Sequence, residues 1–212
     1  MFSGIDQEIA KNMAEKLLYY DMAYFFKYGD VFIYDNSITS VIIGMQNKKM
    51  SLLKRIPFAL KSNVILRKLS KEELNIIKEN SKVISEVHST KWFKKYCKNP
   101  YCFLQFAVDK NKRGQGIARK MLENFFDYVS ITNNYIVLET LTKSNVAIYE
   151  HFGFETMEVY ETKNKELREY RMLKRINAKN SKKLSFGKLS EEDVNFAENE
   201  INNISNQIDN IL

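Results

Sequence analysis

Cysteine, proline and glycine are scarce in this chain of 212 residues, which contains 2 Cys, 2 Pro and 7 Gly. This composition excludes collagen-like, proline-rich and disulfide-scaffold proteins. Cys97 and Cys102 lie five residues apart without a second pair, so neither a zinc site nor a disulfide framework is predicted. We therefore expect reduced thiols, no bound metal and a cytoplasmic protein.

Long apolar segments are also missing. The most apolar early run, Leu17 to Tyr28, is interrupted by Asp21 and Lys27, and it falls short of the ~18 apolar residues that a membrane-spanning helix needs. The first residues lack a basic stretch followed by an apolar one, so they do not resemble a signal peptide. The sequence predicts a soluble protein without a membrane partner.

Aromatic residues are plentiful: 14 Phe and 12 Tyr, in a chain that is 44% hydrophobic, exclude a wholly disordered protein. The net charge of +7 has two interpretations. Proteins that bind nucleic acids cluster Lys and Arg on one element, whereas here they are spread from Lys11 to Lys188, which favours an ordinary solvated surface. One local cluster, Lys110 to Lys120, surrounds a pair of glycines.

Hydrophobic periodicity predicts three helices in the first half of the chain, over residues 5–26, 52–60 and 71–87. Ser70 and Glu73 have the spacing of a capping box at the start of the third helix. Two strands on either side of a polar turn, over residues 31–34 and 38–45, should form an antiparallel pair.

The middle of the chain predicts a strand, a glycine loop and a helix. An apolar strand, Phe103 to Val108, leads through a polar loop into Arg113-Gly114-Gln115-Gly116-Ile117-Ala118. A broad apolar face then predicts a helix from Gly116 to Ser130. The next strand, Tyr135 to Thr140, lies far enough along the chain to run parallel to the first.

The remaining elements are shorter. A helix over residues 145–152, capped by Ser144 and ended by Gly153, precedes two strands over 154–160 and 167–175. We divide the chain into a domain over residues 1–176, a polar linker over 177–190 and an amphipathic C-terminal helix over 191–212. The apolar residues of that helix follow a heptad pattern: Val194, Ala197, Ile201, Ile204, Ile208 and Ile211. Packing against the parent domain is favoured over a homodimer formed through this helix.

A glycine loop before a helix can bind phosphate, because the first backbone N–H groups of a helix are unpaired and carry partial positive charge. The glycines alone are also compatible with a tight turn between strand and helix. A Walker loop requires Gly-Lys-Ser/Thr, and here Ile117 and Ala118 follow Gly116. A dinucleotide fingerprint requires a third glycine where Arg119 stands.

The loop resembles a third type. Arg113 to Ala118 is similar to the Arg/Gln-x-x-Gly-x-Gly/Ala signature of the GNAT superfamily of acyl-CoA-dependent N-acetyltransferases, and it stands between a strand and a helix as in that family. Downstream, Asn145, Tyr149 and the pair Gly153-Phe154 resemble the family's second motif. The resemblance covers residues 102–155. It implies an α+β fold with a mixed, mostly antiparallel twisted sheet of six or seven strands flanked by helices, with the C-terminal helix as an extension.

The resemblance also implies roles for individual residues, with acetyl-CoA as co-substrate. Main-chain groups of one strand would hold the pantetheine arm, the signature loop would hold the pyrophosphate, and Asn145 would contact the cofactor arm. Tyr149 would be the general acid that protonates the departing thiolate, while a main-chain amide near Val108 holds the oxyanion. The implied cofactor-binding residues, beside Asn145 and Tyr149, are Phe106, Ala107, Val108, Arg113, Gly114, Gln115, Gly116, Ile117, Ala118 and Arg119.

The general base is not assigned by the resemblance. Many members of the family carry a strand carboxylate where this chain has Gln105. Glu139 on the adjacent strand and His88 are the remaining candidates for the catalytic base, whereas His151 favours a surface position. An amine of low pKa needs no dedicated base.

Three classes of function follow. The leading prediction is an N-acetyltransferase that acts on a primary amine of a small molecule or peptide. The alternative is a basic RNA- or ribosome-associated protein that uses the same fold without catalysis, and the third is an interaction module that recruits a partner through the C-terminal helix. The sequence does not identify the acceptor amine.

Overall fold

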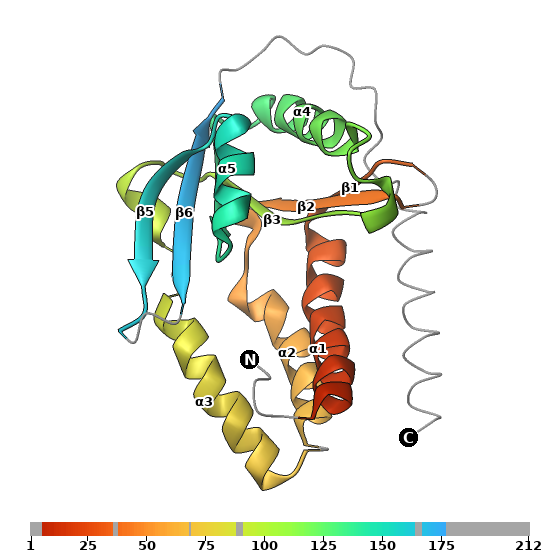
Figure 1. The fold of residues 1–212 in the computed structure, drawn as a ribbon. Coiled ribbons are helices and arrows are strands. Elements are labelled where there is room, and N and C mark those ends of the chain that lie inside the picture. The colour runs from red at the N-terminus through yellow and green to blue at the C-terminus, as the bar shows by residue number, and fades with distance from the viewer. Residues whose placement is uncertain (1–5, 36–37, 68, 88–90, 164–166, 177–212) are drawn as a thin grey trace.

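The computed structural model describes residues 6–35, 38–67, 69–87, 91–163 and 167–176 (Figure 1). Six strands form one sheet with the order β1-β2-β3-β4-β6-β5. Only β3 and β4 pair in parallel, and the other neighbours are antiparallel. The mixed, mostly antiparallel sheet predicted from the sequence is confirmed. Its strands are β1 (Asp30–Ile33), β2 (Ser40–Gln46), β3 (Tyr101–Val108), β4 (Tyr135–Thr140), β5 (Glu155–Glu161) and β6 (Arg168–Arg175).

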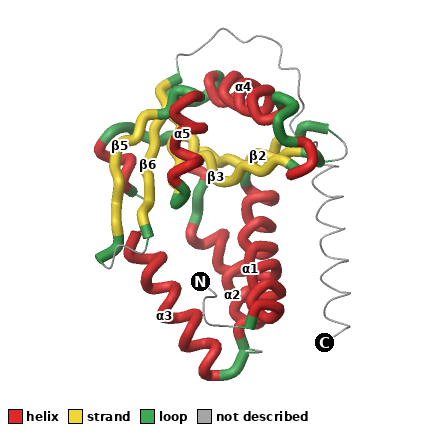
Figure 2. The backbone as a smooth tube through the Cα atoms, viewed as in Figure 1, coloured by secondary structure: helices red, strands yellow, loops and turns green. Residues whose placement is uncertain are grey.

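Helices lie on both faces of this sheet. Helices α4 and α5 cover one face, while α1 and α2 extend side by side from the other and α3 lies below the β5–β6 pair (Figures 1 and 2). Among the helices of the described residues, none is both long and apolar enough to cross a membrane. The helices are α1 (Gln7–Tyr28), α2 (Leu52–Leu66), α3 (Lys71–Val87), α4 (Ile117–Ser130) and α5 (Lys143–His151).

The core has two parts, one on each face of the sheet. The larger cluster joins the sheet to α4, whose Phe125 is fully buried against the rings of Phe32, Tyr101 and Phe103. The smaller cluster lies on the opposite face, where the 3-10 turn Trp92–Lys95 packs its two aromatic residues against β3, β4 and β6. Sequence positions that alternate along β3 and β4 therefore face different cores.

Most boundaries agree with the sequence predictions, and the capping box at α3 is present in both directions. The Ser70 amide donates to Glu73 Oε2 at 2.8 Å, and the Glu73 amide donates to Ser70 Oγ at 3.2 Å. That bond with Ser70 holds the pKa of Glu73 below its usual value. The antiparallel pairing of β1 with β2 and the parallel pairing of β3 with β4 are likewise confirmed.

Some boundaries differ from the predictions. Helix α2 continues past residue 60 to Leu66, with Pro57 inside it. Ser144 does not cap α5, because the helix begins at Lys143 and its N-cap is Thr142. Strand β2 begins at Ser40, since Ile38 has a left-handed φ of 51° that takes the chain out of the extended conformation.

Several predictions lie outside the described residues. They are the polar linker over residues 177–190, the heptad helix over 191–212 and any dimer that this helix would form. His88, one of the candidate bases, also lies in a segment that the structure does not describe.

Candidate active site

Strands β3 and β4 separate shortly after they meet. Their parallel ladder contains only the pairs Tyr101 with Ile136 and Cys102 with Val137. A register shift in the neighbouring β2–β3 ladder accompanies the separation: Gly44 pairs with Phe103 but Ile43 pairs with Gln105, which leaves Leu104 as an extra residue on β3. A bulge of this kind bends its strand, so we attribute the divergence of β3 from β4 to Leu104.

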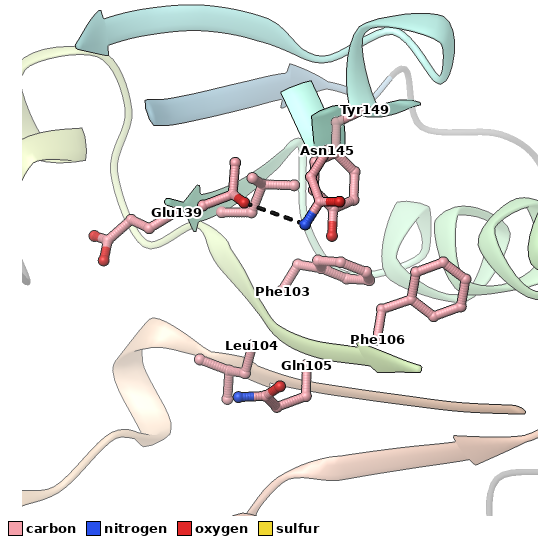
Figure 3. Close-up of a pocket in the computed structure, with 9 residues that line it drawn as sticks. Phe103, Leu104, Gln105, Phe106, Glu139, Asn145 and Tyr149 are labelled. Atoms are coloured by element: carbon pink, nitrogen blue, oxygen red, sulfur yellow. Dashed lines mark hydrogen bonds between the residues drawn. The ribbon is translucent and has the colours of Figure 1, made fainter. Parts of the chain in front are cut away.

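The bulge also determines which side chains face which side of the sheet. Phe103 and Phe106 both pack against the α4 and α5 side, although they are three residues apart. Leu104 and Gln105 both point to the opposite side (Figure 3). The gap between β3 and β4 therefore has side chains from β3 on both faces.

A pocket of about 230 Å³ occupies this gap (Figure 3). Helix α5 contributes Asn145 and Tyr149, which are one turn apart and lie on the same side of the gap. The Asn145 side-chain amide donates to the Thr140 hydroxyl at 3.4 Å, which ties α5 to the end of β4. The nine lining residues are Phe103, Leu104, Gln105, Phe106, Leu138, Glu139, Thr140, Asn145 and Tyr149.

The Tyr149 ring is held by two aromatic neighbours. Its centroid lies 5.8 Å from that of Phe103 and 5.7 Å from that of Phe154, both in edge-to-face arrangement. Burial raises the pKa of the Tyr149 phenol above its ordinary value. Among the described residues none forms a hydrogen bond with its hydroxyl, so the group is a protonated acid that is not committed to another side chain.

Glu139 approaches the pocket from the opposite face. Its side chain points away from Tyr149 (Figure 3), and the indole Nε1 of Trp92 donates to Glu139 Oε1 at 2.7 Å. Arg171 is the residue directly across from Glu139 on β6. Trp92 was not among the residues that the sequence singled out, and its only signal there was an isolated indole in a basic stretch.

The glycine loop lies at the far end of β3, where the chain enters α4. Gly114 and Gly116 have left-handed φ values of 80° and 76°, and no atom lies within 4 Å of the position where a Cβ would stand on either. The Arg113 Nε donates to the carbonyl oxygen of Val108 at 3.3 Å, which closes the loop onto the strand. Residues 111–116 are exposed, so the N-terminus of α4 faces open space.

The predicted site residues fall into three groups. Phe106, Glu139, Asn145 and Tyr149 meet at the pocket, and Ala107 and Val108 continue β3 from it toward the loop of residues 113–119. Arg119 instead reaches the end of α5, where its Nη2 lies 3.3 Å from Nε2 of the exposed His151. Strand β3 therefore leads from the pocket to the loop that precedes α4.

Comparison with known families matches residues 71–156 to the family described as acetyltransferase (GNAT) domain. Over these residues the chain is similar to GNAT acetyltransferases. The matched region begins with α3 and includes β3, the glycine loop, α4, β4 and α5, so every described candidate residue of the site lies within it. Among curated proteins no match to the chain is found.

Several solved structures are distantly similar to this chain. The ribosomal-protein-S18-alanine N-acetyltransferase from Escherichia coli shares 22% identity over 40% of this chain and 59% of its own, with a TM-score of 0.33. Ard1 from Thermoplasma volcanium shares 20% identity over 38% of this chain and 57% of its own, with a TM-score of 0.34. A chain of the NatC complex bound to Gag peptide and CoA shares 16% identity over 67% of this chain and 64% of its own, with a TM-score of 0.39. This chain thus spans less than two thirds of the length of each of these proteins. With TM-scores this low, we infer nothing about the acceptor amine from them.

Proposed function

We propose that this protein is an N-acetyltransferase that uses acetyl-CoA to acetylate a primary amine. The observation that carries the proposal is the position of Asn145 and Tyr149, which face the gap where β3 leaves β4. Two substrates can reach such a gap from different sides. The cofactor would lie along β3 from the glycine loop, and the amine would enter past Leu104, Gln105 and Glu139.

The residues around the loop fit the phosphate groups of CoA. Left-handed glycines leave the backbone N–H groups at the start of α4 uncovered, and the helix dipole favours a negative charge there. Arg113, Arg119, Lys110 and Lys112 add positive charge within the same segment. The loop, followed by the exposed edge of Ala107 and Val108, would hold the cofactor with its thioester at the pocket.

Acetyl-CoA supplies an activated acyl group, and the protein supplies position and proton transfer. The amine nitrogen forms a bond to the thioester carbon, and the C–S bond breaks as the tetrahedral arrangement collapses. Tyr149 gives its proton to the departing sulfur, and its raised pKa keeps that proton in place at neutral pH. The proton lost by the amine passes to Glu139, directly or through water, on the opposite face of the gap.

The acceptor would therefore approach from the side of the sheet that carries Leu104, Gln105 and Glu139. This side is separate from the face covered by α4 and α5. Small amines, peptide N-termini and lysine side chains all present the primary amine that the chemistry requires, and a panel of these three types is the appropriate screen.

Thermal unfolding with acetyl-CoA, CoA and ATP tests the proposal. A ligand at about 100 times its Kd adds roughly 2.7 kcal/mol to the free energy of unfolding, which corresponds to a rise in Tm of about 5–10 °C for a chain of this size. We expect this rise with both CoA species and not with ATP, followed by thiol release from acetyl-CoA when an acceptor amine is added. Equal shifts with ATP, or none with CoA, would contradict the cofactor site.

A further inference from the structure

Helix α2 carries an apolar stripe that faces away from the rest of the described molecule. Four of its aliphatic side chains are largely exposed: Leu52 by 83%, Leu53 by 78%, Ile56 by 50% and Leu60 by 61%. Because an α-helix turns by about 100° per residue, Leu52, Ile56 and Leu60 follow one another along one face with Leu53 beside them. Single exposed apolar residues are ordinary, whereas a contiguous group on one helix marks a surface that is covered by something else.

The contacts of α2 with α1 use the opposite side of the helix. The Phe58 ring packs edge-to-face on Tyr24 at 5.8 Å, and the cations of Lys54 and Arg55 lie over the rings of Tyr28 and Tyr24 at 4.8 Å and 5.4 Å. Residues 54, 55 and 58 are about half a turn away from the apolar stripe. Helix α1 therefore cannot bury Leu52, Leu53, Ile56 and Leu60.

The charge of the chain segment that contains α2 is of one sign. Residues 47–69 contain seven Lys and Arg (Lys48, Lys49, Lys54, Arg55, Lys61, Arg67 and Lys68) and no Asp or Glu. The C-terminal residues 190–212 have the complementary composition, with six carboxylates (Glu191, Glu192, Asp193, Glu198, Glu200 and Asp209) and no Lys or Arg. Their heptad pattern supplies an apolar face of matching character, with Ile201, Ile204 and Ile208 at its centre.

The intervening chain is long enough to bring these two segments together. Lys174 at the end of β6, Ile136 on β4, Tyr101 on β3 and Gln46 on β2 are register partners in one row across the sheet. Three strand spacings place Lys174 about 14 Å from Gln46, and the six residues from Gln46 to the start of α2 add at most about 20 Å.

Residues 177–190 can span that distance. Fourteen residues of extended chain reach about 46–50 Å. The two distances above add up to at most about 34 Å between Lys174 and the first residue of α2, so the linker is long enough. We propose that residues 191–212 pack as an amphipathic helix on the stripe formed by Leu52, Leu53, Ile56 and Leu60 of the same chain. The acidic segment then lies next to a part of the chain, residues 47–69, that carries only positively charged side chains.

Hydrogen exchange of the full-length protein tests this packing. Ile201→Asp places a charge in the apolar seam, and Asn203→Asp adds the same charge on the opposite side of the helix as a matched control. We expect the backbone amides of α2 to exchange about tenfold faster in Ile201→Asp and at the wild-type rate in Asn203→Asp. Ile56→Asp should in turn speed exchange in residues 191–212, whereas Val159→Asp, at a site of similar exposure on β5, should not.

Three results would overturn the proposal. The first is unchanged exchange of α2 in Ile201→Asp. The second is protection of α2 that grows with protein concentration and accompanies a doubled mass, which would make a second copy the occupant. The third combines two observations: the protein binds to vesicles of anionic phosphatidylglycerol and Ile56→Asp abolishes this binding, while Ile201→Asp leaves the exchange of α2 unchanged. A lipid surface would then be the occupant of the stripe.

Discussion

The indole N–H of Trp92 donates a 2.7 Å hydrogen bond to the carboxylate of Glu139, and the two residues are 47 positions apart in the sequence. Trp92 is 4% exposed and packs against the rings of Phe93 and Tyr96. A donor fixed in this way restricts the rotamer of its acceptor. Trp92 therefore holds Glu139 on the face of the sheet from which we expect the acceptor amine to approach.

We predict that Glu139→Gln lowers kcat by about 100-fold, because general base catalysis by a positioned side chain typically contributes a factor of this order. Trp92→Phe should lower kcat by about tenfold and leave the KM for acetyl-CoA unchanged. In the Glu139→Gln background, the same Trp92→Phe change should have no further effect on kcat, since it acts through the carboxylate. Steady-state kinetics on the four proteins measure this cycle.

Phe93→Leu provides the matched control, because Phe93 belongs to the same buried cluster but its side chain has no group that can donate a hydrogen bond to Glu139. This variant should lower Tm without changing kcat at a temperature where it is folded. If Trp92→Phe and Glu139→Gln instead have independent effects that multiply, Trp92 is a packing residue only.

Tyr149→Phe should lower kcat by about 10²- to 10⁴-fold while leaving the Kd for acetyl-CoA nearly unchanged. In the proposed mechanism the hydroxyl is the proton donor to sulfur, whereas the ring that packs on Phe103 and Phe154 is retained in the variant. Steady-state measurement of thiol release gives kcat, and a titration with acetyl-CoA gives the Kd. Tyr135→Phe, a half-buried tyrosine on β4, is the control and should keep wild-type kcat. Weaker CoA binding with normal kcat at saturation would show that Tyr149 holds the cofactor instead.

The raised pKa of Tyr149 predicts the shape of the pH profile. Burial disfavours the phenolate, so the phenol retains its proton above its ordinary pKa of about 10. The proposed mechanism uses the protonated form, so kcat should show no fall that depends on Tyr149 below about pH 10. Measurement of kcat between pH 6 and 10 checks this expectation. A descending limb near pH 8 that disappears in Tyr149→Phe would show that the phenol ionises far earlier.

The fold and one half of the candidate site could be predicted from the sequence, because their signals are local. Gly114 and Gly116 adopt the left-handed φ that glycine permits, and Asn145 and Tyr149 share a face of α5 because they are four residues apart. The strands and helices follow from hydrophobic periodicity over a few residues each. In these parts of the chain local preference and tertiary structure agree.

The other half of the site depends on contacts between distant segments. The bulge at Leu104 is a property of the register between β2 and β3, which no local pattern specifies. It turns Leu104 and Gln105 to one side, so a count of alternating positions along β3 assigns one of them to the wrong face. The bond between Trp92 and Glu139 likewise requires that β4 and the preceding 3-10 turn be already in place.

Gly116→Ala tests the loop. Alanine in a left-handed conformation costs about 1–2 kcal/mol, so the loop should rearrange and the Kd for CoA should rise about tenfold, with kcat at saturation little changed. Isothermal titration with CoA measures the affinity. Gly153→Ala is the control: Gly153 also has a left-handed φ of 80°, but it follows α5, and a Cβ at this position would meet Lys174 Nζ at 2.8 Å and no atom of the loop. Its replacement should lower Tm and leave CoA affinity unchanged, and equal losses of affinity would contradict a phosphate site at Gly116.

Gly44→Ala should destabilise the fold near the gap itself. The added Cβ would overlap the ring of Tyr101 and lie 3.1 Å from Phe125 Cε2. Neither ring can move away. Tyr101 is fully buried and its hydroxyl donates to Asp30 Oδ2 at 2.7 Å, and Phe125 of α4 is also fully buried in the core. Overpacking of this kind typically costs about 1–3 kcal/mol, which corresponds to a fall in Tm of roughly 3–10 °C for a chain of this size. Tyr101 is also one of the two residues through which β3 pairs with β4, so an unchanged Tm in Gly44→Ala would mean that this junction is far more compliant than its packing indicates.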